Sequence, residues 1–230
     1  MHIEAADSDA RGKAMTDIKA VTEILMFGAG GHAAAVSDVI RDIGDFHISG
    51  VIDDSLELQG KRLFGSVVIG GHQQVYMDGL ETIAIFLGIG DNLTRARIAR
   101  SLADREFPIL VHPTAHVGTN VSLGEGTVVM PRAIIENGAK VGAHCIINNG
   151  AVVGHGSVVE DYCHVSGNAV LAGGVSLGER CLVGIGGCVL PNVAIGQDSI
   201  VSAGSVANRS APERHYIMSP SARIIRRYKK

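Results

Sequence analysis

The second half of the chain carries an unbroken six-residue rhythm of aliphatic side chains. From Val111 to Val201 every sixth residue is Val, Leu or Ile, and the residue four places later is small or Val at each step. Such a run is far longer than chance allows where aliphatic residues are a minority. A fixed short period is typical of a repeat architecture in which each unit stacks on the one before. The pattern predicts one short strand and one turn in each hexad.

Three hexads close one triangular coil, so the coil repeats every 18 residues. The aliphatic side chain is expected to point inward, and the Gly that often follows it, as in Val117-Gly118, permits a sharp bend. Residues 111–206 are therefore predicted to form a β-helix. Cys145, Cys163 and Cys181 recur at the coil period and should stack along one inner edge as small apolar side chains.

The first half of the chain has the order strand, glycine-rich turn, helix, strand, acid. Buried strands are expected at 24–28, 48–52 and 82–87, and a helix at 33–43. The turn is Gly28-Ala29-Gly30-Gly31-His32-Ala33, and Asp53-Asp54 follow the second strand. This order opens a nucleotide-binding βαβ unit, in which backbone N–H groups hold a pyrophosphate at the helix N-terminus. The alternative is that the glycines only make a tight turn. Residues 22–110 leave room for half of a doubly wound domain, which suits a mononucleotide better than NAD.

Composition and charge narrow the class of protein. The 230 residues include 46% apolar residues, 4% aromatic residues and 30 Gly, which fits an aliphatic core with many turns. A net charge of −3 gives no reason to expect a nucleic acid or a membrane as partner. No apolar run approaches the roughly 18 residues of a membrane span. Residues 1–21 read as a disordered extension without the apolar segment of a signal peptide, so we expect a cytoplasmic protein.

Several motifs together resemble a known family. The GAGGH turn and the Ile52-Asp53-Asp54 motif precede a hexapeptide coil that contains Gly154-His155 and Cys163-His164-Val165-Ser166. This arrangement resembles the bacterial nucleotide-sugar N-acetyltransferases that act on 4-amino sugars of the bacillosamine and perosamine type, which are related to sialic acid O-acetyltransferases. The resemblance extends over roughly residues 22–228. It implies an α/β Rossmann-like half-domain followed by a left-handed parallel β-helix, acetyl-CoA as co-substrate, no metal, and a homotrimer with its active sites between neighbouring coils.

The resemblance also assigns residues. His155 matches the general base, and His164 and the backbone of Gly173 match groups around the acetyl thioester. Ile185 and Ala203 match contacts to CoA. The contacts to the nucleotide-linked sugar match Gly30, Gly31, His32, Asp53, Asp54 and Gly90.

The chain departs from the family next to the proposed base. The family commonly has an acidic residue directly after the catalytic histidine, and here that position is Gly156. The carboxylate that makes the histidine more basic could instead come from Glu136, Glu160 or Asp161, or from a neighbouring subunit. His155 is the third residue of its hexad and should point outward, where an imidazole can accept a proton from an amine. His112, His116 and His144 are expected to be surface or turn residues.

Other functions stay open at this stage. A sugar O-acetyltransferase would use the same fold, and a non-catalytic nucleotide-binding scaffold gains some weight from Gly156. A metal-dependent hydratase is disfavoured because the histidines lack that family's spacing. Residues 207–230 are expected to form a C-terminal tail, whose basic residues from Arg223 onward either hold CoA phosphates or are solvated.

Overall fold

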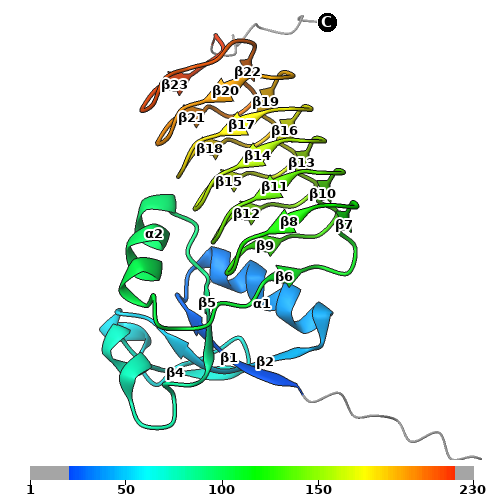
Figure 1. The fold of residues 1–230 in the computed structure, drawn as a ribbon. Coiled ribbons are helices and arrows are strands. Elements are labelled where there is room, and N and C mark those ends of the chain that lie inside the picture. The colour runs from blue at the N-terminus through cyan, green and yellow to red at the C-terminus, as the bar shows by residue number, and fades with distance from the viewer. Residues whose placement is uncertain (1–20, 221–230) are drawn as a thin grey trace, which may run out of the picture.

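In a computed structural model of the protein, residues 21–220 can be described, and they form a small α/β domain followed by a β-helix (Figure 1). The basic residues from Arg223 onward and all but one residue of the predicted N-terminal extension lie outside the described residues. Within 21–220, no helix is long and apolar enough to cross a membrane.

The N-terminal domain is a five-stranded sheet in the order β3-β4-β2-β1-β5. Its elements are β1 (Thr22–Phe27), α1 (Gly31–Ile43), β2 (Phe46–Ile52), β3 (Arg62–Leu63), β4 (Ser66–Gly70), β5 (Ala84–Leu87) and α2 (Asn92–Ser101), with short 3-10 helices η1 (Leu56–Leu58) and η2 (His72–Tyr76). All neighbouring strands are parallel except the β3–β4 hairpin. The predicted βαβ unit is confirmed, and the hairpin is an addition that the sequence pattern did not reveal.

The β-helix consists of two-residue strands, one in each hexad. They are β6 (Leu110–Val111), β7 (His116–Val117), β8 (Ser122–Leu123), β9 (Val128–Val129), β10 (Ile134–Ile135), β11 (Lys140–Val141), β12 (Ile146–Ile147), β13 (Val152–Val153), β14 (Val158–Val159), β15 (His164–Val165), β16 (Val170–Leu171), β17 (Ser176–Leu177), β18 (Leu182–Val183), β19 (Cys188–Val189), β20 (Ala194–Ile195), β21 (Ile200–Val201), β22 (Val206–Ala207) and β23 (Tyr216–Ile217). Each strand pairs in parallel with the strand one coil away, for example Ile134 with Val152.

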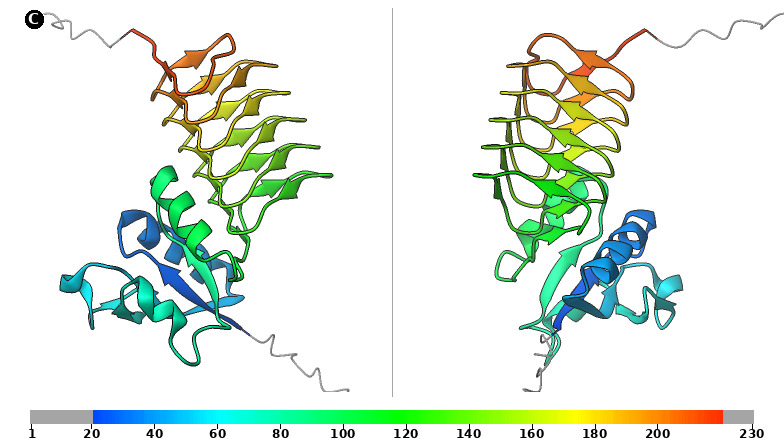
Figure 2. Two further views of the ribbon diagram at one scale, coloured as in Figure 1. Left: turned by 60° about the vertical axis from the view of Figure 1, so that its left-hand side comes forward. Right: turned by 90° about the vertical axis from the view of Figure 1, so that its right-hand side faces the viewer.

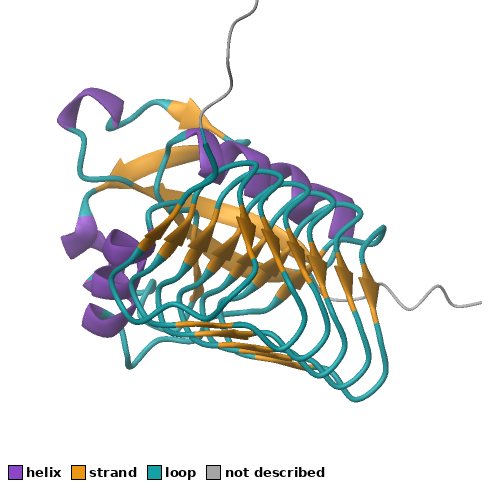
Figure 3. Ribbon diagram, turned by 90° about the horizontal axis from the view of Figure 1, so that it is seen from above, coloured by secondary structure: helices purple, strands orange, loops and turns teal. Residues whose placement is uncertain are grey.

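The coil has three flat sides, which Figure 3 shows end-on as a triangle with the helices outside it. We name the first side by the domain that packs on it and the second by its outward apolar side chains. The N-domain face is β6, β9, β12, β15, β18, β21 and β23; the apolar face is β7, β10, β13, β16, β19 and β22; the third face is β8, β11, β14, β17 and β20. The second residue of each strand points into the coil, where Val129, Val165 and Val183 are fully buried.

The aliphatic rhythm therefore forms the core, as predicted. Cys145, Cys163 and Cys181 are fully buried within it. Val117 in the first coil is 37% exposed, because a coil at the end of a stack has a neighbour on one side only.

The coil continues beyond residue 206, where the hexad rule placed its end. Ile200 pairs with Tyr216, an offset of 16 residues instead of 18. The last coil is thus two residues short and leaves the six-residue register. A search for a fixed period cannot detect a coil of a different length.

The two domains share one apolar junction. The outward side chains of Leu110, Val128 and Ile146 on the N-domain face pack in one cluster with residues of α1 and the sheet. Helix α2 lies along the lower coils (Figure 2). This packing buries His112 and His144, which were expected to be surface or turn residues; His144 does lie in a turn, and His112 lies 3.1 Å from a carboxylate oxygen of Asp42. A linear pattern does not reveal that a second domain covers these turns.

Candidate active site

The glycine-rich turn is open on the side where a phosphate would bind. Gly28 needs glycine for its backbone, since its φ is +105°. Gly30 has an ordinary φ of −82°, and a Cβ added at Gly30 or Gly31 would meet no atom within 4 Å. Packing therefore does not require glycine at these two positions. No side chain caps the first N–H groups of α1, and uncapped N–H groups at a helix N-terminus suit an anionic ligand.

The two predicted acids have structural partners as well. One carboxylate oxygen of Asp53 accepts the N–H of Ala29 at 2.9 Å, and the other accepts the N–H of Ser55 at 2.9 Å. Asp54 accepts the N–H of His72 at 2.8 Å. Asp53 therefore connects the glycine-rich turn to the end of β2. Its carboxylate accepts the N–H of Ala29, one of the turn N–H groups predicted as possible donors to a pyrophosphate.

His32 and His164 face each other where the domains meet. Their ring centroids are 6.3 Å apart, and His164 Nε2 lies 3.0 Å from the side-chain nitrogen of Asn148. Burial, and then the charge of Arg95, lower the pKa of each histidine to about 4. Both imidazoles are neutral at pH 7. His32 Nε2 is buried and has no hydrogen-bond partner among the described residues.

A cavity of about 230 Å³ opens beside His164. The start of α2, at Gly90–Leu93, forms one wall, and Leu182 and Ile200 of the coil form another. Arg180 and Asp198 pair at 2.7 Å beside it. The structure thus brings together Gly90, His32 and His164, three of the predicted residues, next to an open cavity.

His155 lies elsewhere, in the turn between β13 and β14, and is exposed. Its ring lies over the backbone of Gly173 one coil further on, because a Cβ on Gly173 would be 2.4 Å from two of its ring atoms. Of the three candidate carboxylates in the chain, Glu136 is the one hydrogen-bonded to this residue. Its Oε2 accepts the backbone N–H of His155 at 2.8 Å, so it orients the turn and not the imidazole.

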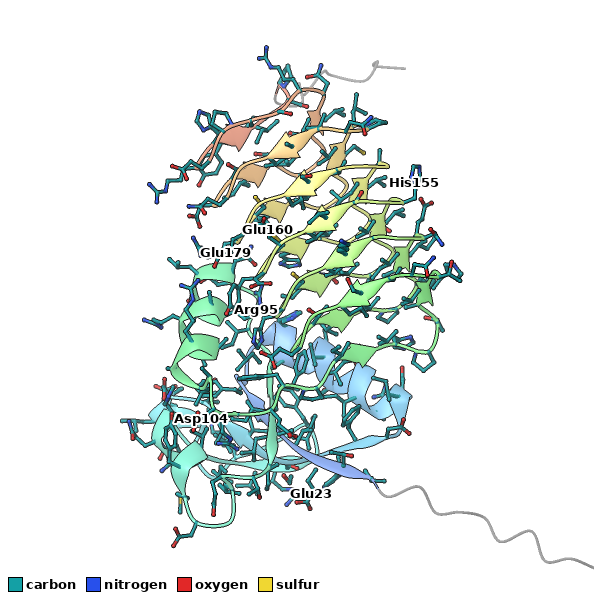
Figure 4. The ribbon with its side chains drawn as sticks, viewed as in Figure 1. Glu23, Arg95, Asp104, His155, Glu160 and Glu179 are labelled. Carbon is teal, nitrogen blue, oxygen red and sulfur yellow. The ribbon has the colours of Figure 1, made fainter. Side chains whose placement is uncertain are left out.

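The triangular section separates the two predicted catalytic groups. His155 occupies the corner between the apolar face and the third face, and this corner is opposite the N-domain face that carries His164. Figure 4 shows His155 and the N-domain side, marked by Arg95, on different sides of the coil. Ile185 and Ala203 stack at the corner between the N-domain face and the apolar face. One chain therefore does not assemble the whole predicted site.

Sequence reasoning missed two residues of the junction, Arg95 and Asn92. Arg95 is 1% exposed, and Asn92 donates from Nδ2 to the carbonyl oxygens of Arg180 and Cys181. An arginine on a short helix is usually solvated, so no sequence signal marked it. Within residues 21–220, no group of three or more His, Cys, Asp or Glu side chains is placed to hold a metal ion.

Comparisons with known proteins agree with this arrangement. Residues 23–102 match the PglD N-terminal domain family, and residues 107–206 match the GMPPB C-terminal domain family. A curated relative, the UDP-N-acetylbacillosamine N-acetyltransferase of Bacillus subtilis, is 38% identical over 113 residues, which is 46% of this chain and half of the relative.

Two solved structures match over most of their length. A perosamine N-acetyltransferase variant from Caulobacter crescentus, in complex with CoA and GDP-perosamine, is 34% identical with a TM-score of 0.80, and the match covers 86% of this chain and 93% of that one. The acetyltransferase domain of PglB from Neisseria gonorrhoeae, in complex with acetyl coenzyme A, is 29% identical with a TM-score of 0.78, over 84% and 93% of the two chains. With its α/β half-domain, parallel coil and near-complete match to the perosamine enzyme, this chain belongs to the family of nucleotide amino-sugar N-acetyltransferases.

Proposed function

We propose that the protein transfers the acetyl group of acetyl-CoA to the amino group of a nucleotide-linked 4-amino-4,6-dideoxy sugar. The proposal rests mainly on two features of the same chain. One is the open, uncapped helix N-terminus at Gly30–Gly31, and the other is the exposed His155, whose ring lies over Gly173 of the coil. The Caulobacter relative was solved with both CoA and GDP-perosamine, and the Neisseria domain with acetyl coenzyme A. We place the reaction in the cytoplasm, where acetyl-CoA is made, as a step toward a surface glycan.

The chemistry assigns one role to each group. The sugar amine attacks the thioester carbonyl, the C–S bond breaks, and an amide forms. His155 takes the proton of the amine and returns it to the departing CoA thiolate. His164 and the Gly173 backbone line the thioester, and Ile185 and Ala203 contact the pantetheine arm. Holding the amine against the carbonyl supplies much of the rate in such transfers.

We further propose that the site is shared between subunits of a homotrimer, because one chain holds His155 and His164 on opposite sides of its coil. The apolar face suits a second copy of the chain. Its outward side chains include Ile134 (39% exposed), Val170 (36%) and Val206 (50%). The third face is more polar at the equivalent places, where Ser122, Lys140 and Ser176 accompany Val158 and Ala194. Association through the apolar face brings His155 of one subunit toward the N-domain face of the next.

Turnover against a panel of UDP-, GDP- and dTDP-linked 4-amino sugars tests the reaction. We expect a product whose acetyl group survives mild base, as an amide does. A base-labile product would show a sugar O-acetyltransferase instead. Nucleotide binding without any acetyl transfer from acetyl-CoA would show a non-catalytic scaffold.

Mixing two inactive variants tests the shared site. His155→Ala removes the base, and Gly31→Phe places a large side chain at the phosphate turn, where an added Cβ would meet no atom within 4 Å. In randomly mixed trimers, about one quarter of the interfaces join an intact His155 to an intact turn, so activity should return to about a quarter of the parent value. No recovery in verified mixed trimers would show that each subunit uses its own groups.

A further inference from the structure

Arg95 is a buried cation at the junction of the two domains. It lies on α2, is 1% exposed, and sits between the helix and the coil in Figure 4. Its Nη1 donates to the carbonyl oxygens of Ile89 at 2.9 Å and Gly90 at 3.1 Å. On the coil side, its Nε donates to His144 O and its Nη2 to Tyr162 O, both at 2.8 Å.

No carboxylate forms a close ion pair with Arg95 within residues 21–220, so its hydrogen bonds go to carbonyl and amide oxygens, and Asp91 attracts its charge only at longer range. Burying a cation in this way is costly unless its donors are satisfied. The planar guanidinium can satisfy them only in one arrangement of the two segments. Burial therefore turns this side chain into a rigid spacer, which a flexible, solvated arginine would not be.

The two segments it joins both carry predicted ligand contacts. On one side is the Gly90 backbone, which also contacts the His164 ring. On the other side is the turn at Tyr162–Cys163, which leads directly into His164. Asn92 reinforces the link, since its Oδ1 accepts from Arg95 Nη2 at 2.7 Å while its Nδ2 holds the coil.

We infer that Arg95 is a positioning residue for acetyl transfer: its fork fixes the sugar-nucleotide loop at Gly90 relative to the thioester wall at His164. This inference rests on the proposed function. Arg95 touches neither substrate in this arrangement and acts through Gly90 and His164.

The charge of Arg95 serves the same site. After burial, it is the next cause that lowers the pKa of His164 and of His32 to about 4. The other charged groups around this cavity are Asp91, which caps the N-terminus of α2, and the Arg180–Asp198 pair on the coil. His164 therefore presents an uncharged imidazole beside the thioester.

Arg105 supplies a matched control. It is also buried, at 8% exposure, and it also donates only to carbonyl oxygens, of Val75, Leu80 and Ile83. All its partners lie within the N-terminal domain. Arg95→Gln and Arg105→Gln should therefore both lower the melting temperature. Only Arg95→Gln should lower kcat at saturating substrates, by about 10- to 100-fold, as expected for a misplacement of about 1 Å.

A second readout needs no turnover. The titration midpoint of His164, followed by NMR on histidine-labelled protein, should rise in Arg95→Gln and stay at the parent value in Arg105→Gln. If the parent acetylates no sugar nucleotide, the proposed function fails, and this titration still tests the link between Arg95 and His164. If Arg95→Gln does not fold, Asn92→Ala is the milder variant, because it removes the side-chain hydrogen bonds of Asn92 and keeps the charge of Arg95. It should lower kcat and leave the titration midpoint of His164 low.

The inference is overturned if Arg95→Gln keeps kcat within twofold of the parent. It is also overturned if the two arginine variants lose turnover in parallel with their melting temperatures, because Arg95 would then be only a structural residue. An unchanged His164 midpoint in Arg95→Gln would remove the electrostatic part of the argument, and unchanged turnover in Asn92→Ala would remove the geometric part.

Discussion

Gly173→Ala is the most direct test of how the coil seats the proposed base. The added Cβ would lie 2.4 Å from Cε1 and Nε2 of His155, and ordinary contact needs about 3.4 Å. The imidazole must therefore retreat by about 1 Å. A displacement of that size in a reacting group costs roughly 100-fold in rate. Stability should change by less than about 1 kcal/mol, because the clash is with the end of an exposed side chain and Gly173 does not have a left-handed φ.

The assay is steady-state acetyl transfer, with the melting temperature measured on the same preparations. Gly167→Ala is the control, since a Cβ there would lie 3.6 Å from the carbonyl oxygen of Asn149, an ordinary contact. We expect Gly167→Ala to behave like the parent. Turnover of Gly173→Ala within threefold of the parent would refute the reasoning, because the ring position would then not matter to the reaction.

Four further outcomes are expected. His155→Ala should lose at least about 100-fold in turnover and keep its melting temperature; activity within a few-fold would point to another base. Asp53→Ala should raise the KM for the sugar nucleotide about 10-fold and leave that for acetyl-CoA unchanged, because the carboxylate holds the phosphate turn through Ala29; a weaker acetyl-CoA KM would contradict this. Val170→Asp should split the trimer and abolish activity, whereas Ser176→Asp on the third face should do neither, as sedimentation can check. Stability should fall as the pH drops from 6.5 toward 4, since burial lowers the pKa of His32, His144 and His164 to about 4 and only the unfolded chain gains those protons. At pH 5 each histidine contributes about 2 kcal/mol to this loss in chemical denaturation, and a flat profile would contradict it.

The sequence alone determined the architecture to a large extent. A β-helix is built from local repeats, and each inward Val, Leu or Ile depends only on its place in the hexad, so the period reveals the core directly. The outward position of His155 follows from the same rule. The glycine-rich turn could be recognised because strand, turn and helix are contiguous in the chain.

The tertiary structure decided what depends on contacts between distant segments. The short last coil to Tyr216 and the β3–β4 hairpin break the period that made the rest predictable. Burial of His144 and Arg95 requires that the N-terminal domain packs on one face of the coil, and no local pattern encodes that docking. The separation of His155 from His164 comes from the triangular section, in which residues nine apart in sequence lie on a corner and on the face opposite to it.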